Sequence, residues 1–349
     1  MSLRRRSWLV LTDGYLTERN AKTAHGVLRY SRDEVAAVVD GGYAGMRLAD
    51  VLPSIGRDAP IVKSVRDGLR YGPTSLLLGV ATPGGWIPDH WRDMVIDAID
   101  AGLEIANGLH KFLRDDPDLV RLADQRGARL WDVRDPPPGI PLFSGKNLRS
   151  PQKVVLTVGS DCAVGKMTAS LELAAAATAA GYATEFIATG QTGILIAGKG
   201  IAVDRVISDF VAGAAEQLVT GADPTATVLM VEGQGSLWHP AYSGVTLGLL
   251  HGSAPHAMVL VHQPGRDAIE EPPYTRLPPL PEMVSTYEAL AAPVRPARVV
   301  CVVLNCRGLD EAAVRRAVAD VEAETGLPAG DVLAGDSPKL WDAVQAVLR

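Results

Sequence analysis

Cysteine is scarce in this chain, which carries three, Cys162, Cys301 and Cys306, among 349 residues. Three thiols are too few for the disulfide framework of many small secreted domains, and a reducing compartment is the simpler interpretation. Positive charge is also in short supply, because 34 lysines and arginines face 40 aspartates and glutamates and leave a net charge of −6. That balance argues against a protein that lives on nucleic acid or on an anionic membrane.

Long hydrophobic runs are missing as well. No stretch approaches the ~18 consecutive apolar residues that a membrane helix needs. Three arginines at positions 4–6 resemble the basic start of an export signal, but the apolar run WLVL behind them stops at Thr12 and Asp13. These absences predict a soluble, cytoplasmic protein with no membrane partner and no nucleic-acid partner.

What the sequence does contain is an alternation of strand-like and helix-like segments. A chain of 349 residues exceeds one ordinary hydrophobic core and predicts two domains. In the first half, SWLVL, EVAAVVD and TSLLLGVA are typical of strands, and HWRDMVIDAIDAGLEIANGLHKFL shows the clearest helical pattern. Strands that alternate with helices indicate βαβ units around a parallel sheet.

A segment rich in proline, glycine and charge, DVRDPPPGIPLFSGKNLRSPQK, separates the two halves and is typical of a linker. The second half begins again with the strand KVVLTVG and continues with TEFIAT, TVLMVEG, AMVLVH and RVVCVVLN. These runs are apolar throughout, as expected where helices cover both faces of a parallel sheet. Ligands should bind at the carboxyl ends of such strands.

The stretch GSDCAVGKMT, residues 159–168, follows the strand KVVLTVG and opens a helix. It approaches the P-loop pattern G-x-x-x-x-G-K-[ST], but five residues instead of four separate Gly159 from Gly165. Backbone N–H groups and a helix N-terminus bind phosphate in such a turn, and Lys166 would reach the β- and γ-phosphates. The alternative is a glycine-rich turn with an ordinary surface lysine, which the order strand, loop, helix disfavours. The predicted nucleotide-binding residues of the loop are Gly159, Ser160, Asp161, Cys162, Ala163, Val164, Gly165, Lys166, Met167 and Thr168.

Together these patterns predict an α/β chain in three parts. They are a Rossmann-like N-terminal domain (residues 1–135), a linker (136–152) and a P-loop NTPase-like C-terminal domain (153–349). The first domain lacks G-x-G-x-x-G, so dinucleotide binding is not supported there. Asp40, followed by two glycines, would suit a ribose contact, although an aspartate at a strand end is common.

The loop resembles that of dethiobiotin synthetase and its amide-forming relatives in cobalamin synthesis. Their pattern G-T-D-x-x-V-G-K-T also has five residues between the glycines, and Asp161, Val164 and Lys166 match it together with both glycines. The stretch VEGQGS likewise resembles their V-E-G-A-G-G segment, whose glutamate ends a strand and helps to hold Mg. Carried over, Glu232 would be a Mg ligand that faces Lys166 across the site. A weaker match is Asn305 in VVLNCRG, which would contact the adenine edge or would simply terminate its strand.

Met167 stands where the P-loop supplies a hydroxyl to Mg, and methionine has none. Thr168 would supply one if the extra loop residue shifts the register; otherwise acidic residues alone hold the metal. Mg favours a few carboxylates with water and phosphate oxygens, and Asp161, Asp204 and Asp209 are candidates beside Glu232. Asp161 has a second possible role near the γ-phosphate, and the two roles stay open. The predicted metal ligands are Thr168, Asp209 and Glu232, and the predicted catalytic residues are Lys166, Asp161 and Glu232.

The chain also resembles, from end to end, a bacterial family labelled as a domain of unknown function, which joins a Rossmann-like half to this P-loop half. The matching stretches are AKTAHGVLRY, LEIANGLHKFL, GSDCAVGKMTAS, ATGQTGILIAGKG, SDFVAGAAE and VEGQGSLWHP. Met167 is typical of the family and so does not indicate an inactive site. One member is described as a D-glutamate N-acetyltransferase, associated with a partner similar to dipeptide epimerases, which implies chemistry on an amino acid or dipeptide. Relatives with this P-loop type commonly pair as dimers, so a homo-oligomer is expected.

The residues and the family description favour different reactions. The P-loop residues favour an ATP- and Mg-dependent amide ligase, which activates an amino-acid or peptide carboxylate as an acyl phosphate for attack by an amine. The family description favours an acetyl-CoA-dependent N-acetyltransferase that acts on an acidic amino acid such as D-glutamate. A third hypothesis is a nucleotide-binding regulator without turnover. Both enzymatic hypotheses place a small amino-acid or peptide substrate near the loop.

The substrate pocket is predicted from two further segments. ATGQTG ends the second strand of this half and would bind a carboxylate, although a plain glycine-rich turn is nearly as good an interpretation. Two polar rings follow Glu232 closely and are candidates to line the pocket. The predicted substrate-binding residues are Thr189, Gln191, Thr192, His239 and Tyr242.

The long irregular segment PGRDAIEEPPYTRLPPLP, residues 264–281, is a third feature of this half. Loops of that length in compact domains are often functional. Arg266 on it would pair with a substrate carboxylate, or would be a solvated surface arginine. His262, which opens the segment, is either a structural histidine or a proton carrier.

Overall fold

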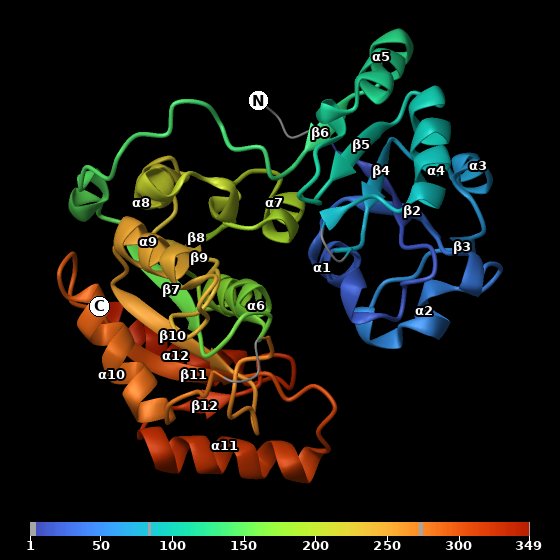
Figure 1. Cartoon of the computed structure of the whole chain (residues 1–349). Helices are drawn as coiled ribbons and strands as arrows, with labels where there is room; N and C mark the ends of the chain where they lie inside the picture. The colour runs from blue at the N-terminus through green and yellow to red at the C-terminus, as the bar shows by residue number, and fades with distance from the viewer. Residues whose placement is uncertain (1–4, 83–84, 272–274, 349) are drawn as a thin grey trace. The chain divides into compact units, whose positions relative to one another are not determined.

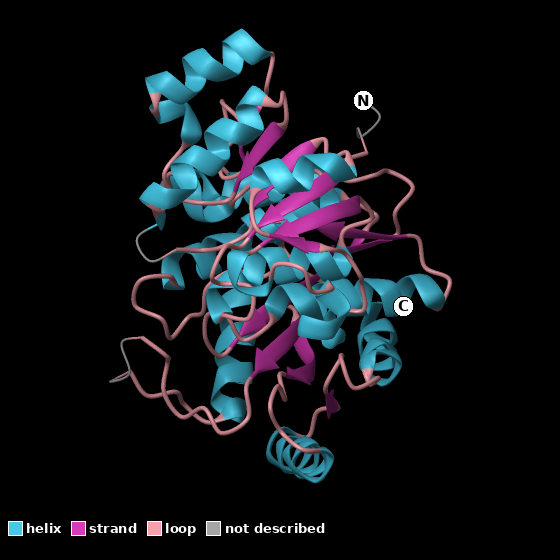
Figure 2. Cartoon of the chain, turned by 90° about the vertical axis from the view of Figure 1, so that its right-hand side faces the viewer, coloured by secondary structure: helices cyan, strands magenta, loops and turns pink. Residues whose placement is uncertain are grey.

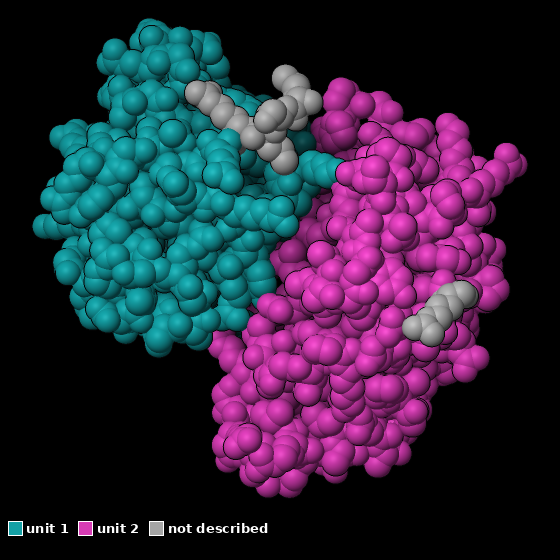
Figure 3. Space-filling view, turned by 180° about the vertical axis from the view of Figure 1, so that it is seen from behind, with its two compact units in different colours: residues 1–135, 191–199 teal, residues 136–190, 200–349 magenta. Residues whose placement is uncertain are grey.

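The computed structural model describes residues 5–82, 85–271 and 275–348. The chain forms two compact units, coloured separately in Figure 3. Unit 1 comprises residues 1–135 and 191–199, and unit 2 comprises residues 136–190 and 200–349. Each unit contains one six-stranded parallel sheet with helices, so the predicted α/β class with two parallel-sheet domains is confirmed.

Unit 1 is built on strands in the order β3-β2-β1-β4-β5-β6, all parallel (Figure 1). This is the strand order of dinucleotide-binding folds, in which the order reverses beside β1. The strands are β1 (Ser7–Leu11), β2 (Glu34–Val39), β3 (Ile61–Val62), β4 (Ser75–Leu78), β5 (Glu104–Asn107) and β6 (Leu130–Asp132). The α-helices are α1 (Lys22–Tyr30), α2 (Leu48–Val51), α3 (Val65–Gly68), α4 (Asp89–Asp100), α5 (Pro117–Arg126) and α7 (Gln191–Ala197).

The helix predicted from HWRDMVIDAIDAGLEIANGLHKFL is wrong in its second half. Helix α4 ends at Asp100, and Gly102 adopts a left-handed φ of 74°, which the helix cannot continue through. Residues 104–107 then form β5, which pairs with both β4 and β6. Burial between two strands decided this conformation, and the apolar spacing alone did not reveal it.

Asp40 lies at the end of β2 and is completely buried. Its Oδ2 accepts hydrogen bonds from Thr12 Oγ1, Gly14 N and Leu16 N, each at 3.1 Å, and its Oδ1 accepts one from Gly42 N at 3.0 Å. The carboxylate is therefore occupied by the chain's own donors, most of them in the loop after β1. Asp40 holds that loop in place and is not free for a ribose.

Unit 2 is built on strands in the order β12-β11-β10-β7-β9-β8, again all parallel. Helices flank the strands, as the cyan and magenta elements of Figure 2 show. The strands are β7 (Lys153–Gly159), β8 (Thr184–Ile187), β9 (Val228–Val231), β10 (Ala257–His262), β11 (Arg298–Leu304) and β12 (Ala329–Gly330). The α-helices are α6 (Lys166–Ala179), α8 (Val211–Thr220), α9 (Ser243–Ser253), α10 (Leu280–Ala291), α11 (Glu311–Thr325) and α12 (Ser337–Leu348).

The core of unit 2 has two layers, one on each face of the sheet. Along β7, Leu156 and Val158 pack with residues of α8, α9, α10 and α11, whereas Val155 packs with α6 and α12. The alternation follows the two-residue period of a strand. Because both faces are covered, the strands must be apolar throughout, which is why they were recognisable as continuous runs.

The segment predicted as a linker belongs to unit 2 in the structure. It contains the 3₁₀ helix η7 (Lys146–Arg149), and Asn147 Nδ2 donates to Gly252 O at 2.8 Å. Ser144 N donates to Glu216 Oε2 at 2.7 Å. None of the helices in the three described ranges has the length and apolarity to span a bilayer.

Candidate functional site

The loop of residues 160–165 joins the end of β7 to the start of α6 at the carboxyl edge of the unit 2 sheet. Strand β7 lies between β10 and β9. Gly159 pairs with Val261 of β10, and Leu156 pairs with Val231 of β9, so the segments after these strands leave the sheet beside the loop. The carboxyl edge of a parallel sheet is the usual place for a ligand. The predicted order of strand, glycine-rich loop and helix is therefore found in the structure.

Side chains from other elements hold the carbonyl groups of this loop. Tyr287 OH donates to Gly159 O at 2.8 Å, and Ser236 Oγ donates to Ser160 O at 2.9 Å. Asn305 Nδ2 donates to Val164 O at 3.1 Å. Two loop amides are bonded within the chain, since Ser160 N donates to Val261 O at 3.0 Å and Cys162 N donates to Asp161 Oδ1 at 2.6 Å. The N–H groups of Ala163 and Gly165 donate no backbone–backbone hydrogen bond within the described residues, and the first turn of α6 adds N–H groups that every helix leaves unpaired.

Lys166 begins α6 and is 6% exposed. Its Nζ donates to the backbone O of Asp161 at 2.8 Å and forms no ion pair within the described parts of the chain. Burial lowers the pKa of Lys166 to about 8, and the nearby charges of Cys162, Asp161 and Glu232 work against that shift. A buried ammonium without an ion-pair partner is the strongest sign of an anion site in this unit.

Two glycines make room for the lysine side chain. A Cβ added to Gly159 would lie 2.8 Å from Lys166 Nζ, and one added to Gly233 would lie 3.0 Å from its Cδ. The Gly233 position is closed from the other side as well, because the same Cβ would lie 1.8 Å from Thr157 O. Both glycines are therefore required by the close approach of the lysine and the backbone.

Glu232 follows β9 and is 4% exposed. Its Oε2 accepts hydrogen bonds from Thr189 N at 3.0 Å and Gly190 N at 3.1 Å, while Thr189 Oγ1 donates to Glu232 O at 2.6 Å. Burial raises the pKa of Glu232 to about 7 in spite of these bonds and of the nearby Lys166. Lys166 and Glu232 thus lie close enough to favour each other's charged form, which agrees with their predicted positions on adjacent strand ends.

Asp161 connects the loop to the long segment after β10. Its Oδ2 accepts from Arg266 Nη1 at 2.5 Å and from Glu270 N at 2.9 Å, and its Oδ1 accepts from Cys162 N at 2.6 Å. Arg266 is buried apart from 13% of its side chain and is paired with Asp161, so it is not a solvated surface arginine. Residues 272–274 of the same segment lie outside the described residues.

Two histidines lie at the loop, and they differ in role. A ring nitrogen of His239, the sulfur of Cys162 and a carboxylate oxygen of Asp161 all lie within 4.8 Å of one another. Tyr242, which is 48% exposed, lies with its ring 4.5 Å from that of His239. His262 Nδ1 instead pairs with Ser160 Oγ at 3.0 Å, and burial, aided by Arg266, lowers the pKa of His262 to about 4. His262 is therefore a neutral support of the loop.

The predicted metal ligands Thr168, Asp209 and Glu232 lie in or directly after three different elements, and a shared metal site there stays a prediction. Within the described ranges, the group of histidine, cysteine and acidic side chains with converging ligand atoms is Asp161, Cys162 and His239. Asp209 is exposed in the 3₁₀ helix η9 (Ser208–Phe210), and Thr168 is half-buried in the first turn of α6. One carboxylate oxygen of Glu232 already accepts two amide bonds.

The residues predicted to contact the substrate lie in different parts of the structure. Thr189 lies at Glu232, but Gln191 and Thr192 belong to α7 in unit 1, where Thr192 Oγ1 donates to Thr23 Oγ1 at 3.2 Å. Asn305 Nδ2 donates to Val164 O of the loop, and its Oδ1 accepts from Arg307 N at 3.3 Å, so Asn305 supports the loop, and its contact with an adenine stays a prediction. Sequence reasoning missed Tyr287 and Ser236, since a tyrosine in an amphipathic helix and a serine in a turn carry no signal of their own.

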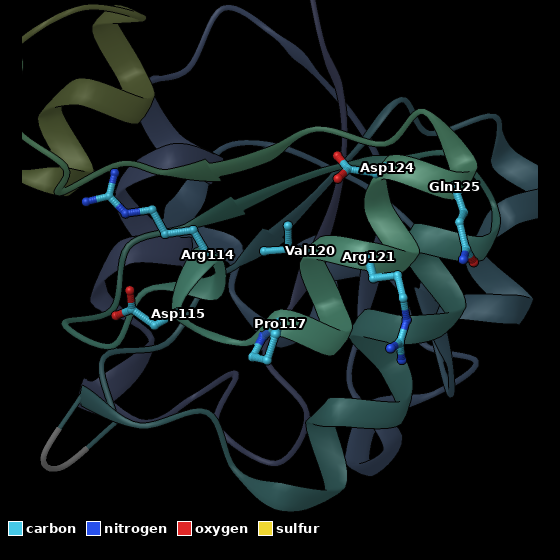
Figure 4. Close-up of a pocket in the computed structure, with 7 residues that line it drawn as sticks. All are labelled: Arg114, Asp115, Pro117, Val120, Arg121, Asp124 and Gln125. Atoms are coloured by element: carbon cyan, nitrogen blue, oxygen red, sulfur yellow. The ribbon is translucent and has the colours of Figure 1, made fainter.

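A pocket in unit 1, shown in Figure 4, contains none of the predicted site residues. Its two arginines are paired locally, Arg114 with Asp135 and Arg121 with Asp118. Its lining comes from the 3₁₀ helix η6 (Leu113–Asp115) and from α5. The lining residues are Arg114, Asp115, Pro117, Val120, Arg121, Asp124 and Gln125.

Comparison with known proteins connects both units to one family. Residues 42–136 match the DUF1611_N profile, described as a Rossmann-like domain of unknown function, and residues 141–341 match the DUF1611 profile, described as its P-loop domain. A crystal structure of a DUF1611 family protein from Anabaena variabilis has a TM-score of 0.93 and 42% identity, and the match covers 98% of this chain and 100% of that one. A P-loop domain suggests a ligand with nucleotide phosphates.

Two curated relatives carry the name D-glutamate N-acetyltransferase. The one from Tritonibacter scottomollicae is 38% identical over 298 residues, which cover 85% of this chain and 89% of that protein. The one from Pseudoalteromonas sp is 40% identical over 233 residues, which cover 67% of this chain and 69% of that protein.

Proposed function

Because the chain belongs to the DUF1611 family, we propose that it shares the activity named for its curated relatives, the N-acetylation of an acidic amino acid such as D-glutamate, with acetyl-CoA as the donor. One observation carries this proposal. The 38% identity with the Tritonibacter scottomollicae protein extends over 85% of the chain, which is more than either unit alone contains. The likeness is therefore not a likeness of P-loops in general.

The anion site of unit 2 suits this reaction. Both substrates carry anionic groups, the phosphates of acetyl-CoA and the carboxylates of the amino acid. Lys166 is a buried cation without an ion-pair partner in the described residues, and the loop amides and the α6 N-terminus lie beside it. In the reaction the amine nitrogen attacks the thioester carbonyl, the C–S bond breaks, CoA leaves as the thiol, and one proton is released.

A second candidate is the ATP- and Mg-dependent amide ligase. It is supported by the closeness of Lys166 and Glu232 at the ends of adjacent strands, an arrangement suited to phosphoryl transfer. There Lys166 and the loop amides would hold the phosphates of ATP, and Glu232 would hold Mg through the carboxylate oxygen that accepts no backbone amide. The two candidates differ in what leaves the enzyme, a thiol or ADP with phosphate.

The experiment compares both donors on one preparation. Purified protein receives acetyl-CoA or ATP with Mg, together with D-glutamate, L-glutamate or D-aspartate, and products are identified by mass spectrometry. We expect N-acetyl-D-glutamate with one equivalent of free thiol and no requirement for ATP. ADP formed only in the presence of an amine and a carboxylate would support the ligase, and binding without turnover in every mixture would support a regulator.

Competition experiments then identify which substrate anion the loop of residues 160–165 binds. ADP and 3′-phospho-ADP compete with acetyl-CoA if the loop holds the donor's phosphates, whereas glutarate competes with D-glutamate if it holds a carboxylate. Lys166→Met should abolish competition by the inhibitor whose anion binds in the loop. Lys63→Met, at an exposed position in unit 1, is the matched control.

A further inference from the structure

The P-loop contains a thiol in an unusual setting. Cys162 is half-buried and reduced, and its sulfur lies within 4.8 Å of both an Asp161 oxygen and a His239 nitrogen. The other two thiols are core residues, where burial raises the pKa of Cys301 to about 12 and that of Cys306 to about 11. Cys162 alone among the three is surrounded by polar groups of a site.

Charged groups of both signs lie around this thiol, because the Asp161 carboxylate is within 4.8 Å of its sulfur. The Lys166 ammonium lies near enough to Cys162 for the two groups to interact electrostatically. Arg266 reaches the neighbouring Asp161 at 2.5 Å, and α6 begins at Lys166 with its N-terminus toward the loop. Cations and a helix N-terminus are the surroundings that activate catalytic cysteines.

His239 brings a ring nitrogen to within 4.8 Å of the Cys162 sulfur. Its Nδ1 accepts the N–H of Ala241 at 3.3 Å, so the neutral ring carries its proton on Nε2. The ring is 8% exposed and is fixed in addition by its contact with Tyr242. An imidazole close to a cysteine is the arrangement found around nucleophilic thiols.

We propose, building on the acetyl-transfer function, that Cys162 is the nucleophile that carries the acetyl group between the two substrates. In the first half-reaction the Cys162 thiolate attacks the carbonyl carbon of acetyl-CoA, the C–S bond to CoA breaks, and CoA leaves and takes a proton from water. In the second, the amine of the amino acid attacks the Cys162 thioester, the amide C–N bond forms, and the thiolate is restored. The two protons that the ammonium group gives up pass to water, and His239 is a positioning residue for the thiolate.

This assignment also identifies the anion that the loop holds during the second half-reaction. In acetyl-CoA the pantetheine arm separates the thioester from the diphosphate, so one loop of six residues cannot hold both ends of the molecule at once. With the thioester at Cys162, the anion at Lys166 is a carboxylate of the amino acid. A carboxylate held there would place the amine of a short amino acid beside the acetylated sulfur.

The first test is direct detection of the acetyl-enzyme. Protein mixed with acetyl-CoA alone is quenched in acid, and its intact mass is measured and mapped to peptides. We expect one acetyl group on Cys162, removed by hydroxylamine or by D-glutamate. Cys162→Ala should lose the label and more than roughly 1,000-fold in kcat/KM, whereas Cys301→Ala should keep both.

The second test uses initial velocities and thiol reactivity. Acetyl-CoA and D-glutamate should give parallel double-reciprocal lines, and acetyl-CoA should protect Cys162 from iodoacetamide. In His239→Ala the alkylation of Cys162 should move to higher pH, and His239→Gln, which retains an N–H donor, should restore part of the shift. A mere loss of structure would not produce that rescue.

Two results would overturn the assignment of Cys162 as the nucleophile, and a third would refute the proposed function. Full acetyl transfer by Cys162→Ala with intersecting lines would remove the acetyl-enzyme and leave the proposed function intact. Stoichiometric zinc that survives chelation in wild type and is lost in both Cys162→Ala and His239→Ala would make the thiol a metal ligand. Absence of any N-acetylated product with every acceptor would instead refute the proposed function itself.

Discussion

The carboxyl edges of the two sheets are built from similar elements but differ in whether the chain's own groups close the loop beside the acidic residue. In each unit a central strand leads through a loop into a helix, and an acidic residue follows a neighbouring strand, Asp40 after β2 and Glu232 after β9. Asp40 accepts the amides of Gly14 and Leu16 in the loop after β1, so its edge is closed by the protein itself. Glu232 accepts amides from the segment after β8 and leaves the loop after β7 open.

The difference teaches that an acidic residue at a strand end does not by itself mark a site. What distinguishes unit 2 is the buried ammonium of Lys166, which donates to Asp161 O and forms no ion pair among the described residues. Unit 1 satisfies its buried carboxylate within the chain, which stabilises the fold and removes a binding group. The following substitutions test that contrast, from the largest expected effect to the smallest.

Of the four substitutions that test this contrast, Lys166→Met should lower activity the most. Removal of a buried cation that faces a substrate anion is expected to lower kcat/KM for acetyl transfer by about 10²–10³-fold. The free energy of unfolding should not fall, because the variant removes a desolvated charge. Steady-state kinetics and urea unfolding measure the two effects, with Lys63→Met as the exposed control. Wild-type kcat/KM in Lys166→Met would mean that Lys166 binds no substrate anion and that the carboxyl edge of the unit 2 sheet is closed, like that of unit 1.

Gly233→Ala should lower the free energy of unfolding by roughly 3 kcal/mol, since overpacking against backbone cannot relax cheaply. The new Cβ would lie 1.8 Å from Thr157 O and 3.0 Å from Lys166 Cδ. Gly244 in α9 is the matched control, because a Cβ there meets nothing within 4 Å. Gly244→Ala should be neutral or stabilise by about 0.5–1 kcal/mol. Equal melting temperatures for the two variants would contradict the packing at Gly233.

Glu232→Gln should change how the free energy of unfolding depends on pH, because burial raises the pKa of the Glu232 carboxyl. The folded pKa of about 7 lies above the ordinary 4.5, so the folded protein binds this proton more tightly than the unfolded chain does. Stability from the protonated carboxyl is complete below about pH 4.5 and is lost as pH rises through about 7. The wild type should therefore lose stability relative to the variant across that window, on the order of 2–3 kcal/mol. Urea unfolding from pH 5 to pH 8, with exposed Glu34→Gln as control, measures the slope.

Asp40→Asn should show the smallest effect and should act on stability alone. The amide keeps one acceptor oxygen and turns an NH₂ group toward donors, so about 1–3 kcal/mol of unfolding free energy should be lost. The KM values for both substrates should stay at wild-type values, in contrast to Lys166→Met. Thermal unfolding and kinetics check the two parts, and Asp93→Asn on the exposed side of α4 is the control. A raised KM in Asp40→Asn would mean that the unit 1 edge also binds substrate.

Much of the fold was visible in the sequence because burial on both faces of a parallel sheet leaves continuous apolar runs. SWLVL, KVVLTVG and AMVLVH are strands β1, β7 and β10, and the helix begins at Lys166 as the loop pattern predicts. The exception is β5, whose residues continue a helical apolar pattern across Gly102. Only its pairing with β4 and β6 shows why that segment is extended.

The candidate site was predictable to a smaller degree. The loop and Lys166 were predicted from the local order of strand, glycine-rich turn and helix, and Glu232 was predicted from the resemblance of VEGQGS to the V-E-G-A-G-G segment. The supports of the loop come from distant segments, Tyr287 from α10 and Arg266 from the segment after β10, and no local pattern marks them. For the same reason the metal site predicted at Thr168, Asp209 and Glu232 stays a prediction, and the cluster that does converge was not foreseen.

By itself the sequence determined the alternation of strands and helices, the presence of a glycine-rich loop ending in Lys166, and the composition of two α/β sheets, since these follow from periodicity and from short-range backbone geometry. Tertiary structure alone decided which polar groups are satisfied. It closed Asp40 against its own chain, tied Arg266 to Asp161, and brought His239 to Cys162. Hydrogen bonds and ion pairs depend on distances between segments far apart in the chain, and those distances exist only once the sheets have formed.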